Sequence, residues 1–409
     1  MESVIQVAGG VCAPQGFRAG GLRSGIAKKP GKKDLAVIVS DVRANAAAVY
    51  TLNKVQGAPI TLTKRHLLDG RAQAMLCNSG NANTCNADGE EIAREMCELA
   101  ADALRIASRD VIVASTGVIG QPLPIAPIRS ALPALARELA DTPEAASNAA
   151  EAIMTTDTFE KQISVAFTLG GKLCHIGGMA KGSGMIQPNM ATMLAFLTTD
   201  AAISPELLKK SLEAAVRETF NMVSVDGDTS TNDMAAILAN GMAGNPAIEK
   251  EDENFDLFSL ALMYVCIYLA RSMAKDGEGA TKLLECAVSG APYESAARIL
   301  AKSVICSSLF KAAMFGADAN WGRVLCALGY APVDFDIHKT KVEFSSRAGR
   351  VLVCENGAGV DFDEHEAKKI LSENEIEILI DLCQGEGTAV AWGCDLTYDY
   401  VKINGDYRS

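Results

Sequence analysis

The sequence has few histidines and lacks the usual spacings of metal, nucleotide and redox sites. Its 409 residues include four histidines, which lie far apart and show neither metal-ligand spacing nor the surroundings of a catalytic triad. No G-x-x-x-x-G-K-[ST] loop is present, and Gly182-x-Gly184 has no third glycine in Rossmann spacing. Metal chemistry, histidine-assisted nucleophiles and nucleotide binding are therefore not expected. The four histidines are His66, His175, His338 and His365.

Basic residues are fewer than acidic residues in this sequence. The sequence has 38 lysines and arginines against 50 aspartates and glutamates, which gives a net charge of -12. Such an excess of negative charge repels phosphate backbones and anionic membranes. We therefore expect neither nucleic acid nor a membrane as partner, although a local basic pocket can still hold a small anion.

The first residues show no leader-like pattern, and the apolar runs are short. The first ten residues show neither a basic segment with an apolar core nor an Arg-rich amphipathic pattern, so we expect a cytoplasmic protein. The longest apolar stretch, Leu257 to Ala270, is shorter than the roughly 20 residues needed to span a bilayer. It is predicted to be a buried helix.

Cysteine is present twelve times, but no pair has C-x-x-C spacing. Most of the cysteines lie in apolar runs, where free cysteine behaves as a small buried hydrophobe. We expect a reducing compartment and neither zinc nor a redox pair.

The composition is that of a globular, loop-rich α/β protein, with 49% hydrophobic residues, 22% charged residues and 35 glycines. Ser204-Pro205-Glu206 predicts a helix start, with an N-cap, a proline in the first turn and an early acid. Further helices are predicted at 90–106, 127–140, 146–154 and 292–315. Strands are predicted at 35–40, 72–77 and 111–114, in a hairpin of 162–168 with 172–177, and in a strand-rich tail at 341–344, 350–354, 376–383, 388–392 and 398–403.

The chain is organised around residues 181–200, where a glycine-rich loop containing Pro188 runs into an apolar strand that begins at Thr192. A lone hydroxyl among small and apolar residues is an unusual strand start. We hypothesise that the Thr192 hydroxyl cuts the peptide bond to Ala191, after which Thr192 is the nucleophile of an acyl-transfer enzyme. The cut creates an α-amine with a reference pKa of about 7.7–8.0, so that base and nucleophile lie on one residue. The alternative is an ordinary loop-to-strand junction.

Two polar motifs follow predicted strands. Thr116 and Gly117 could present a hydroxyl and a backbone N–H together, as an oxyanion hole requires, or could form a glycine turn. The cluster of Asn, Ser and Gly at 78–83 is a turn by composition, and it could also offer amide groups to a ligand.

Acidic motifs lie further along the chain. Residues 155–158, Thr-Thr-Asp-Thr, are either a solvated helix cap or one side of a polar site. Glu278 lies between two glycines and could bind an ammonium group, or could belong to a loop that ends a helix. The acidic run 226–233 is not a calcium loop, because its sixth and twelfth positions are not the required glycine and glutamate.

The central stretch closely resembles the self-cleavage signature of the arginine-biosynthesis ornithine acetyltransferases, the bifunctional glutamate N-acetyltransferase family. The resemblance extends over essentially the whole chain, and Gln187 and the terminal Ser409 depart from the family's usual residues. The motifs that carry it are Gly16-Phe-Arg18, Asn78-Ser-Gly-Asn-Ala-Asn83, Ser115-Thr-Gly-Val-Ile-Gly120, Thr155-Thr-Asp-Thr158, Lys181-Gly-Ser-Gly-Met-Ile, Pro188-Asn-Met-Ala-Thr192, Asp226-Gly-Asp-Thr-Ser-Thr-Asn-Asp233, Asp276-Gly-Glu-Gly-Ala-Thr-Lys282 and the segment at Asn404.

The resemblance implies a fold, a set of chains and an activity. The fold would be a mixed α+β layered sandwich of the ornithine acetyltransferase and self-processing aminopeptidase type, within the α/β class, with a smaller C-terminal α/β region. The pieces would be an alpha chain of residues 1–191 and a beta chain of residues 192–409, with its strand-rich tail at about 340–409. Two copies of each would form a heterotetramer.

The implied activity is acetyl transfer from N2-acetyl-L-ornithine to L-glutamate through an acetyl-Thr192 ester, in cyclic arginine biosynthesis. No metal or cofactor is implied, and acetyl-CoA is left open as a co-substrate. The implied residues are Thr192 as nucleophile, Thr116 and Gly117 as oxyanion hole, and Thr155, Lys181, Thr192, Glu278, Asn404 and Ser409 as substrate-binding residues, with the choice between Thr155 and adjacent Thr156 left open.

Two alternatives remain at this point. A related self-processed aminopeptidase or amidohydrolase would pass the acyl group to water, so that consumption of acetylornithine would not depend on glutamate. A non-catalytic amino-acid-binding protein would stay a single chain and bind ornithine without turnover.

Overall fold

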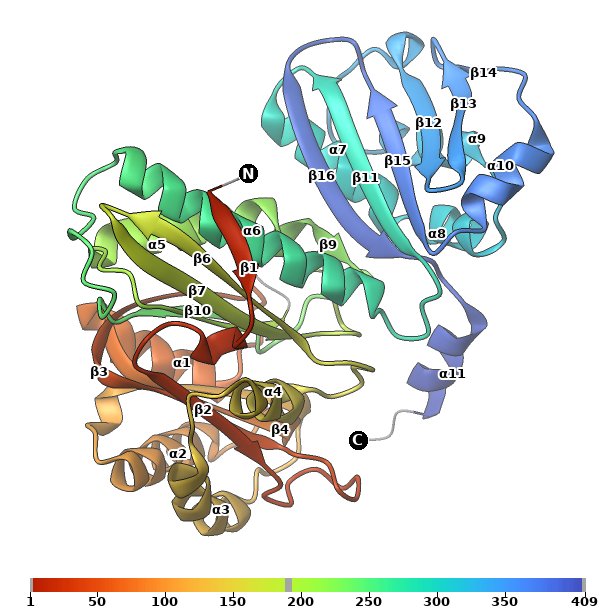
Figure 1. Cartoon of the computed structure of the whole chain (residues 1–409). Coiled ribbons are helices and arrows are strands. Elements are labelled where there is room, and N and C mark those ends of the chain that lie inside the picture. The colour runs from red at the N-terminus through yellow and green to blue at the C-terminus, as the bar shows by residue number, and fades with distance from the viewer. Residues whose placement is uncertain (1–2, 188–192, 407–409) are drawn as a thin grey trace.

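The computed structural model describes residues 3–187 and 193–406 (Figure 1). Ala191, Thr192 and Ser409, three of the predicted site residues, lie outside the described residues. The larger lobe is built on a sheet in the order β1-β6-β7-β8-β10-β3-β4-β5, with β2 paired to β3. Its strands are β1 (Val4–Val7), β2 (Phe17–Leu22), β3 (Leu35–Tyr50), β4 (Arg71–Asn81), β5 (Val111–Val118), β6 (Lys161–Leu169), β7 (Lys172–Lys181), β8 (Leu194–Thr199) and β10 (Met234–Ala239).

The long strand β3 bends and divides this sheet into two layers. Residues 35–45 of β3 pair with β2 and β4, whereas residues 45–50 pair with β10, and the register with β4 shifts between Val39 and Ala44. Side chains of both layers meet in a shared core, which also receives the apolar face of helix α4 (Pro143–Ile153). The bend therefore places β4 and β5 against β8 and β10.

Helices cover the two outer faces of the layers (Figure 1). Helices α1 (Ala58–His66), α2 (Gly89–Leu104) and α3 (Ile125–Glu138) pack on the side of β3, β4 and β5, and α5 (Pro205–Glu218) and α6 (Glu253–Lys275) pack on the other side. The result is a helix–sheet–sheet–helix sandwich, as expected for the fold class.

The C-terminal lobe contains a second sheet in the order β14-β13-β12-β15-β11-β16-β9. Helices pack on one side of it, and its core is continuous with that under α6. Its strands are β9 (Val223–Ser224), β11 (Leu283–Ala291), β12 (Lys341–Ser346), β13 (Gly349–Glu355), β14 (Ala358–Gly359), β15 (Glu375–Asp381) and β16 (Gly387–Cys394), and its helices are α7 (Glu294–Cys306), α8 (Ser308–Phe315), α9 (Trp321–Gly329), α10 (Glu364–Leu371) and α11 (Tyr398–Asp406). Short 3-10 helices lie at Gly10–Cys12, Leu67–Asp69, Ser108–Asp110, Phe220–Met222 and Ile337–Lys339.

Several local predictions are confirmed. Residues 161–169 and 172–181 form the expected hairpin, and Gly170 and Gly171 both take positive φ in its turn. The Ser204 hydroxyl accepts a hydrogen bond from the N–H of Leu207 and caps α5, as the Ser-Pro-Glu pattern predicted.

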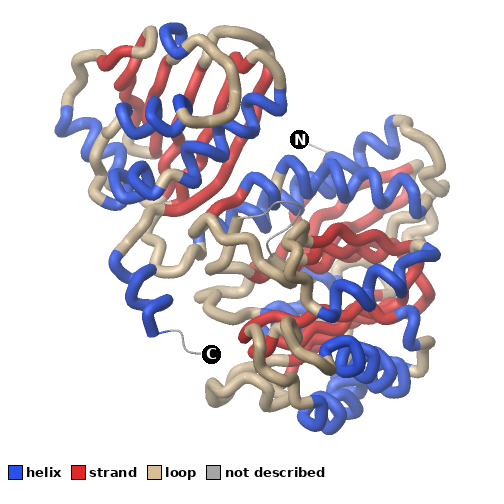
Figure 2. Tube along the Cα trace, turned by 180° about the vertical axis from the view of Figure 1, so that it is seen from behind, coloured by secondary structure: helices blue, strands red, loops and turns tan. Residues whose placement is uncertain are grey.

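The last predicted strand, residues 398–403, is wrong. These residues belong to helix α11, none of whose residues is buried. The Thr397 hydroxyl accepts a hydrogen bond from the N–H of Tyr400 at the start of the helix. Figures 1 and 2 show this helix leaving the C-terminal sheet and lying beside the larger lobe.

The turn predicted at 78–83 is also wrong for its first four residues. β4 continues through Asn81 and pairs with β5, with Ser79 opposite Thr116 and Gly80 opposite Gly117. The polar side chains are tolerated inside because they bond to one another: the Ser115 hydroxyl lies 2.6 Å from Oδ1 of Asn78. The glycine turn considered for Thr116-Gly117 is a paired strand end.

Helix α6 is longer than the apolar stretch from which it was predicted. Its 23 residues are long and apolar enough to cross a membrane by length and composition alone, so the expectation that it is too short is wrong. Half of its apolar window is buried inside the protein, where Leu262 and Val265 pack in the core beneath the larger sheet. The predicted buried helix is thus confirmed.

All twelve cysteines lie among the described residues and are free. Eight are buried, as predicted. Cys306 is partly buried, whereas Cys85, Cys326 and Cys383 are exposed, so the expectation of burial is wrong for these three. Cys326 lies on the exposed side of helix α9, and Cys85 and Cys383 lie in loops.

Candidate active site

A cavity of about 160 Å³ lies at one edge of the larger sheet, where β5 and β7 end and β8 and β10 begin. The two last-named strands are parallel, with Met234 opposite Leu194, so their first residues reach the same edge. The loop after α6 and helix α11 of the C-terminal lobe close the cavity from the other side. Residues from both sides of the predicted cut therefore meet there.

Six of the predicted site residues line this cavity: Thr116, Gly117, Thr155, Lys181, Glu278 and Asn404. Thr156 also lines it, so the geometry does not choose between the two threonines. Met193 and Leu194, which directly follow Thr192 in the chain, line it as well. The segment 155–158 is thus one side of a polar site, in agreement with one of the two interpretations of its sequence.

The end of β5 is held tightly against β4. Gly117 has φ +128°, and a Cβ at this position would collide with the backbone of Gly80, so only glycine fits. The side-chain amide of Asn232 donates to the carbonyls of Ala82 and Ser115, at 2.6 and 3.0 Å, and fixes this strand end from the side of β10. The Thr116-Gly117 segment is therefore a rigid part of the cavity surface.

A lysine and a glutamate bring opposite charges to the cavity. Lys181 ends β7, is largely buried and donates to the Thr116 hydroxyl at 3.3 Å. Glu278 is also largely buried and accepts from the Asn404 amide at 2.7 Å. The loop at Gly184 approaches Glu278 so closely that a Cβ there would overlap its carboxylate.

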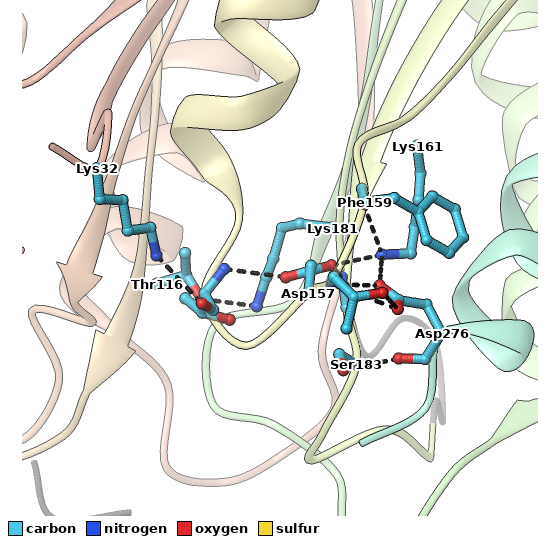
Figure 3. Close-up of polar contacts among 11 residues, drawn as sticks. Lys32, Thr116, Asp157, Phe159, Lys161, Lys181, Ser183 and Asp276 are labelled. Atoms are coloured by element: carbon cyan, nitrogen blue, oxygen red, sulfur yellow. Dashed lines mark hydrogen bonds and ion pairs between the residues drawn. The ribbon is translucent and has the colours of Figure 1, made fainter. Parts of the chain in front are cut away.

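Next to Lys181 lies a buried ion network of Asp157, Lys161 and Asp276, which we call the Asp157 network (Figure 3). Sequence inspection missed it as a functional unit, although Asp157 and Asp276 lie within quoted motifs, because Lys161 is only the first residue of an apparently ordinary strand. Burial opposes ionisation of Asp157, but Lys161 and Lys181 outweigh it and hold the pKa of its carboxyl below the usual range. The carboxylate is therefore charged at neutral pH.

A second buried carboxyl, Asp233, lines the cavity directly before β10. Among the residues that the structure describes, its Oδ2 atom has no hydrogen-bond partner. Burial raises the pKa of Asp233 well above its usual range, and the nearby Ser230, Lys181 and Thr51 do not offset this effect. The sequence offered a signal in the acidic run 226–233, but it was tested only as a calcium loop.

A further lysine lies behind Thr155. Lys32 Nζ donates to the Thr155 carbonyl oxygen at 3.2 Å (Figure 3). Partial burial, and after it the positive charge of Lys181, lower the pKa of Lys32. No feature of the loop at residues 28–33 marked it as part of the site.

Taken together, the cavity suits a small zwitterion. Lys181 can pair with a carboxylate and Glu278 with an ammonium group, and both are shielded from solvent, where charge-assisted hydrogen bonds are strong. In the described part of the chain, no group of three or more His, Cys, Asp or Glu side chains is arranged to hold a metal ion.

Comparison with known proteins gives a consistent picture. The model of the ArgJ family matches residues 18–409. The chain is 50% identical over 397 residues to the arginine biosynthesis bifunctional protein ArgJ of Caldanaerobacter subterraneus subsp. tengcongensis, covering 97% of this chain and 98% of that relative. It is 51% identical over 405 residues to the protein of the same name from Symbiobacterium thermophilum, covering 98% and 99%.

A solved structure is also similar. The crystal structure of arginine biosynthesis bifunctional protein argJ from Bacillus halodurans is 43% identical, with a TM-score of 0.50. The match covers 98% of that chain but only 52% of this one. That crystallised chain is thus about half as long as this sequence.

Proposed function

The chain belongs to the ArgJ family, and from this premise we propose that it transfers an acetyl group from N2-acetyl-L-ornithine to L-glutamate, a step of arginine biosynthesis. The observation that carries this proposal is the single cavity in which Thr116, Gly117, Lys181 and Glu278 meet the chain at Met193. A nucleophile at the preceding residue, an oxyanion site and two opposite charges are the groups that acyl transfer between amino acids requires.

We propose that the chain first cuts itself between Ala191 and Thr192. The Thr192 hydroxyl oxygen would attack the Ala191 carbonyl carbon, the C–N bond to Thr192 would break, and the departing amine would take the hydroxyl proton. Water would then hydrolyse the resulting ester, which releases residues 1–191 with a terminal carboxylate and restores the Thr192 hydroxyl. The half-length chain of the Bacillus halodurans structure supports this step, because residues 192–409 are likewise about half of this sequence. The products would be an alpha and a beta chain, and two of each would form the heterotetramer.

The free α-amine of Thr192 would then accept the proton of its own hydroxyl. The hydroxyl oxygen attacks the acetyl carbonyl carbon of acetylornithine, the C–N bond breaks, and ornithine leaves with the proton on its amine. The acetyl-Thr192 ester is attacked in turn by the amine of glutamate, which releases N-acetylglutamate and restores the hydroxyl. During both attacks Thr116 and Gly117 would donate to the negative oxygen.

The charged groups would orient the substrates. Lys181 would bind the α-carboxylate that acetylornithine and glutamate share, and Glu278 would bind the side-chain ammonium of ornithine. Thr155, in the segment that follows α4, and Asn404, on α11, would complete the site, as would Ser409. For glutamate, which carries a carboxylate in place of that ammonium, a water molecule or a protonated carboxyl would have to separate it from Glu278.

No metal or organic cofactor is proposed for this reaction. The relatives are named bifunctional, and we propose acetyl-CoA as the second acetyl donor. Assaying glutamate acetylation with acetyl-CoA as sole donor tests that extension separately, because acetyl transfer from acetylornithine does not depend on it.

The central experiment combines a gel with an assay. Purified protein should give two bands of about half the mass each, Thr192→Ala should give one, and acetylornithine consumption should require glutamate. A chain that stays intact would contradict the nucleophile. Glutamate-independent consumption would instead favour a hydrolase, and ornithine binding without turnover would favour a non-catalytic binding protein.

A further inference from the structure

The Asp157 network lies directly behind the proposed substrate site. The Lys161 side chain is 0% exposed, and its Nζ lies 2.7 Å from Oδ1 of Asp157 and 2.5 Å from Oδ2 of Asp276 (Figure 3). Burying three charges is often no better for stability than packing apolar side chains of the same volume. Stability alone is therefore a weak explanation of the network.

We propose that Lys161 is a positioning residue that sets the placement of Lys181 and Glu278 in the cavity. It does so through Asp157 on one side and Asp276 on the other. This inference rests on the proposed acetyl transfer and deepens it, because it names the residue that keeps Lys181 and Glu278 at the separation that the substrate requires.

The first connection runs from Lys161 through Asp157. The Asp157 carboxylate accepts the N–H of Gly182 at 2.8 Å and the N–H of Thr155 at 2.9 Å. Gly182 directly follows Lys181, and Thr155 lines the cavity. One carboxylate, fixed by Lys161, therefore holds two neighbouring parts of the cavity surface.

The second connection runs from Lys161 through Asp276. The Asp276 carboxylate also accepts from the N–H and hydroxyl of Thr158, while its backbone carbonyl accepts the Ser183 hydroxyl at 2.7 Å. The N–H of Glu278 donates to the Ser183 carbonyl at 2.9 Å. The segment that carries Glu278 is thereby fastened to the loop that begins at Lys181.

The network also joins the two sides of the proposed cut. Asp157 and Lys161 precede Thr192 in the chain, and Asp276 follows it. After the cut, Lys181 and Glu278 belong to different polypeptides, so only non-covalent contacts fix their separation. The ion pairs of Lys161 are buried contacts of this kind.

Charge balance adds a testable consequence. Asp157 faces Lys161, Lys181 and Lys32, and it shares Lys161 with Asp276. With Lys161 present, Lys181 remains available to a substrate carboxylate. Without it, Asp157 loses the ammonium group bonded to it, and Lys181 and Lys32 are the nearby cations left to pair with it, so Lys181 would be drawn to Asp157 and away from substrate.

The test compares Lys161→Met with the double variant Asp157→Asn/Lys161→Met. We expect Lys161→Met to raise the KM for N2-acetyl-L-ornithine about tenfold at pH 8 with less than about a threefold change in kcat, as loss of a binding interaction predicts. In the double variant the unpaired charge is gone and the side-chain amide oxygen at position 157 can still accept the N–H of Gly182, so KM should return to within about threefold of the wild type. A void or a packing defect would make the double variant at least as poor as the single one.

The pH profile gives a second readout. Removing Lys161 lets Asp157 take up a proton more readily, so the KM of Lys161→Met should recover as the pH falls from 8 to 6, while the wild-type KM should not follow this course. Lys209→Met, at an exposed lysine beside Glu213, is the matched control and should leave KM unchanged.

Three outcomes would overturn the inference: an unchanged KM in folded Lys161→Met, no recovery in the double variant, or no recovery at low pH. Should Lys161→Met fail to fold, Asp276→Asn decides, because it removes one of the two carboxylates that bind Lys161. Its KM should then rise with less than about a threefold change in kcat, and an unchanged KM would refute the positioning role.

Failure of the acetyl transfer itself can be told apart. If the wild type shows no transfer, L-ornithine is titrated into the same variants by calorimetry. A tenfold weaker Kd in Lys161→Met, restored in the double variant, would support the positioning role, and equal Kd values would refute it.

Discussion

Asp157 and Asp233 are two buried carboxyl groups beside the same cavity whose pKa values are shifted in opposite directions. Asp157 accepts hydrogen bonds from Lys161, Gly182 and Thr155, and its pKa is lowered. Asp233 has an unpartnered Oδ2 within the described part of the chain, and its pKa is raised. The difference is that a buried ammonium group and two backbone N–H groups lie within hydrogen-bonding distance of Asp157, and such partners lower the pKa of a buried carboxyl.

The comparison indicates a division of roles. A charged, fully bonded carboxylate can hold backbone in place, as Asp157 does for the cavity edge. A neutral carboxyl can donate as well as accept a hydrogen bond. Asp233 lies beside the chain that enters at Met193, where Met234 donates to the Met193 carbonyl at 2.8 Å. Opposite shifts of this kind are typical of sites that use both forms.

The largest effect is expected from removing the bonded carboxylate. Asp157→Ala should lower the free energy of unfolding by about 3 kcal/mol, because two backbone N–H groups lose their acceptor and Lys161 loses one of its partners. Urea denaturation followed by circular dichroism measures the change. Asp233→Ala should lower the free energy of unfolding less, since no hydrogen bond to Oδ2 is lost. An equal loss in Asp157→Ala and Asp233→Ala would contradict the difference inferred between the two carboxyls.

A smaller free-energy effect, here on catalysis, is expected from a substitution that displaces Glu278 and leaves the Asp157 network intact. Gly184→Ala places a Cβ into the space of the Glu278 carboxylate, which must move. The kcat/KM for acetylornithine should fall about tenfold, or about 1.4 kcal/mol. Gly244→Ala, at an open glycine of positive φ, is a control for strain without a collision; an equal loss of activity there would contradict the contact argument.

The pH dependence of stability should differ in sign between the two carboxyls. Because the pKa of Asp233 is raised on folding, its contribution to stability is fully present below about pH 3.9, the unfolded value, and is lost as the pH rises through the folded pKa. Asp233→Asn removes this loss, so its melting temperature relative to wild type should increase from pH 4 to pH 8. A constant difference would show that Asp233 does not titrate in this way.

For Asp157 the order is reversed. Its pKa is lowered, so its contribution is present above about pH 3.9 and is lost as the pH falls through the folded pKa. The melting-temperature advantage of wild type over Asp157→Asn should therefore shrink as the pH is lowered below about 4. An advantage that grew in acid would contradict the ionised state.

The smallest effect on the free energy of unfolding is expected at an exposed ion pair, which serves as a reference for the buried carboxyls Asp157 and Asp233. Asp41 pairs with Arg18 at 3.1 Å, and both side chains are more than 40% exposed. Asp41→Ala should change the free energy of unfolding by about 0–1 kcal/mol, because solvent and salt screen the pair. A loss as large as that of Asp157→Ala would show that burial is not what distinguishes the Asp157 network.

Much of the site could be predicted because its residues stand in distinctive local motifs. Thr116-Gly117, Thr155, Lys181 and Glu278 all follow recognisable strand or helix ends, and the structure gathers them. The Asp157 network could not be predicted as a unit, since Lys161 and Asp276 are 115 residues apart and sequence gives no sign that they touch. Asp233 was hidden for a related reason, because its missing partner is a property of packing.

Secondary structure failed where tertiary context overrode the local pattern. The alternating residues 398–403 favour a strand, yet the chain leaves the C-terminal sheet there and forms the exposed helix α11 (Figure 1). The polar residues of β4 favour a turn, yet β5 supplies partners inside the core. In both cases the deciding interaction comes from a distant segment.

The sequence by itself determined the family, the hairpin of 161–169 with 172–181, the N-cap of α5 and the motif that surrounds Thr192, because these depend on residue order and local chemistry. Only the tertiary structure decided which distant side chains surround the cavity and in which direction the pKa of each buried carboxyl is shifted. Those properties follow from burial and from the approach of a single lysine, and neither is written in the spacing of residues along the chain.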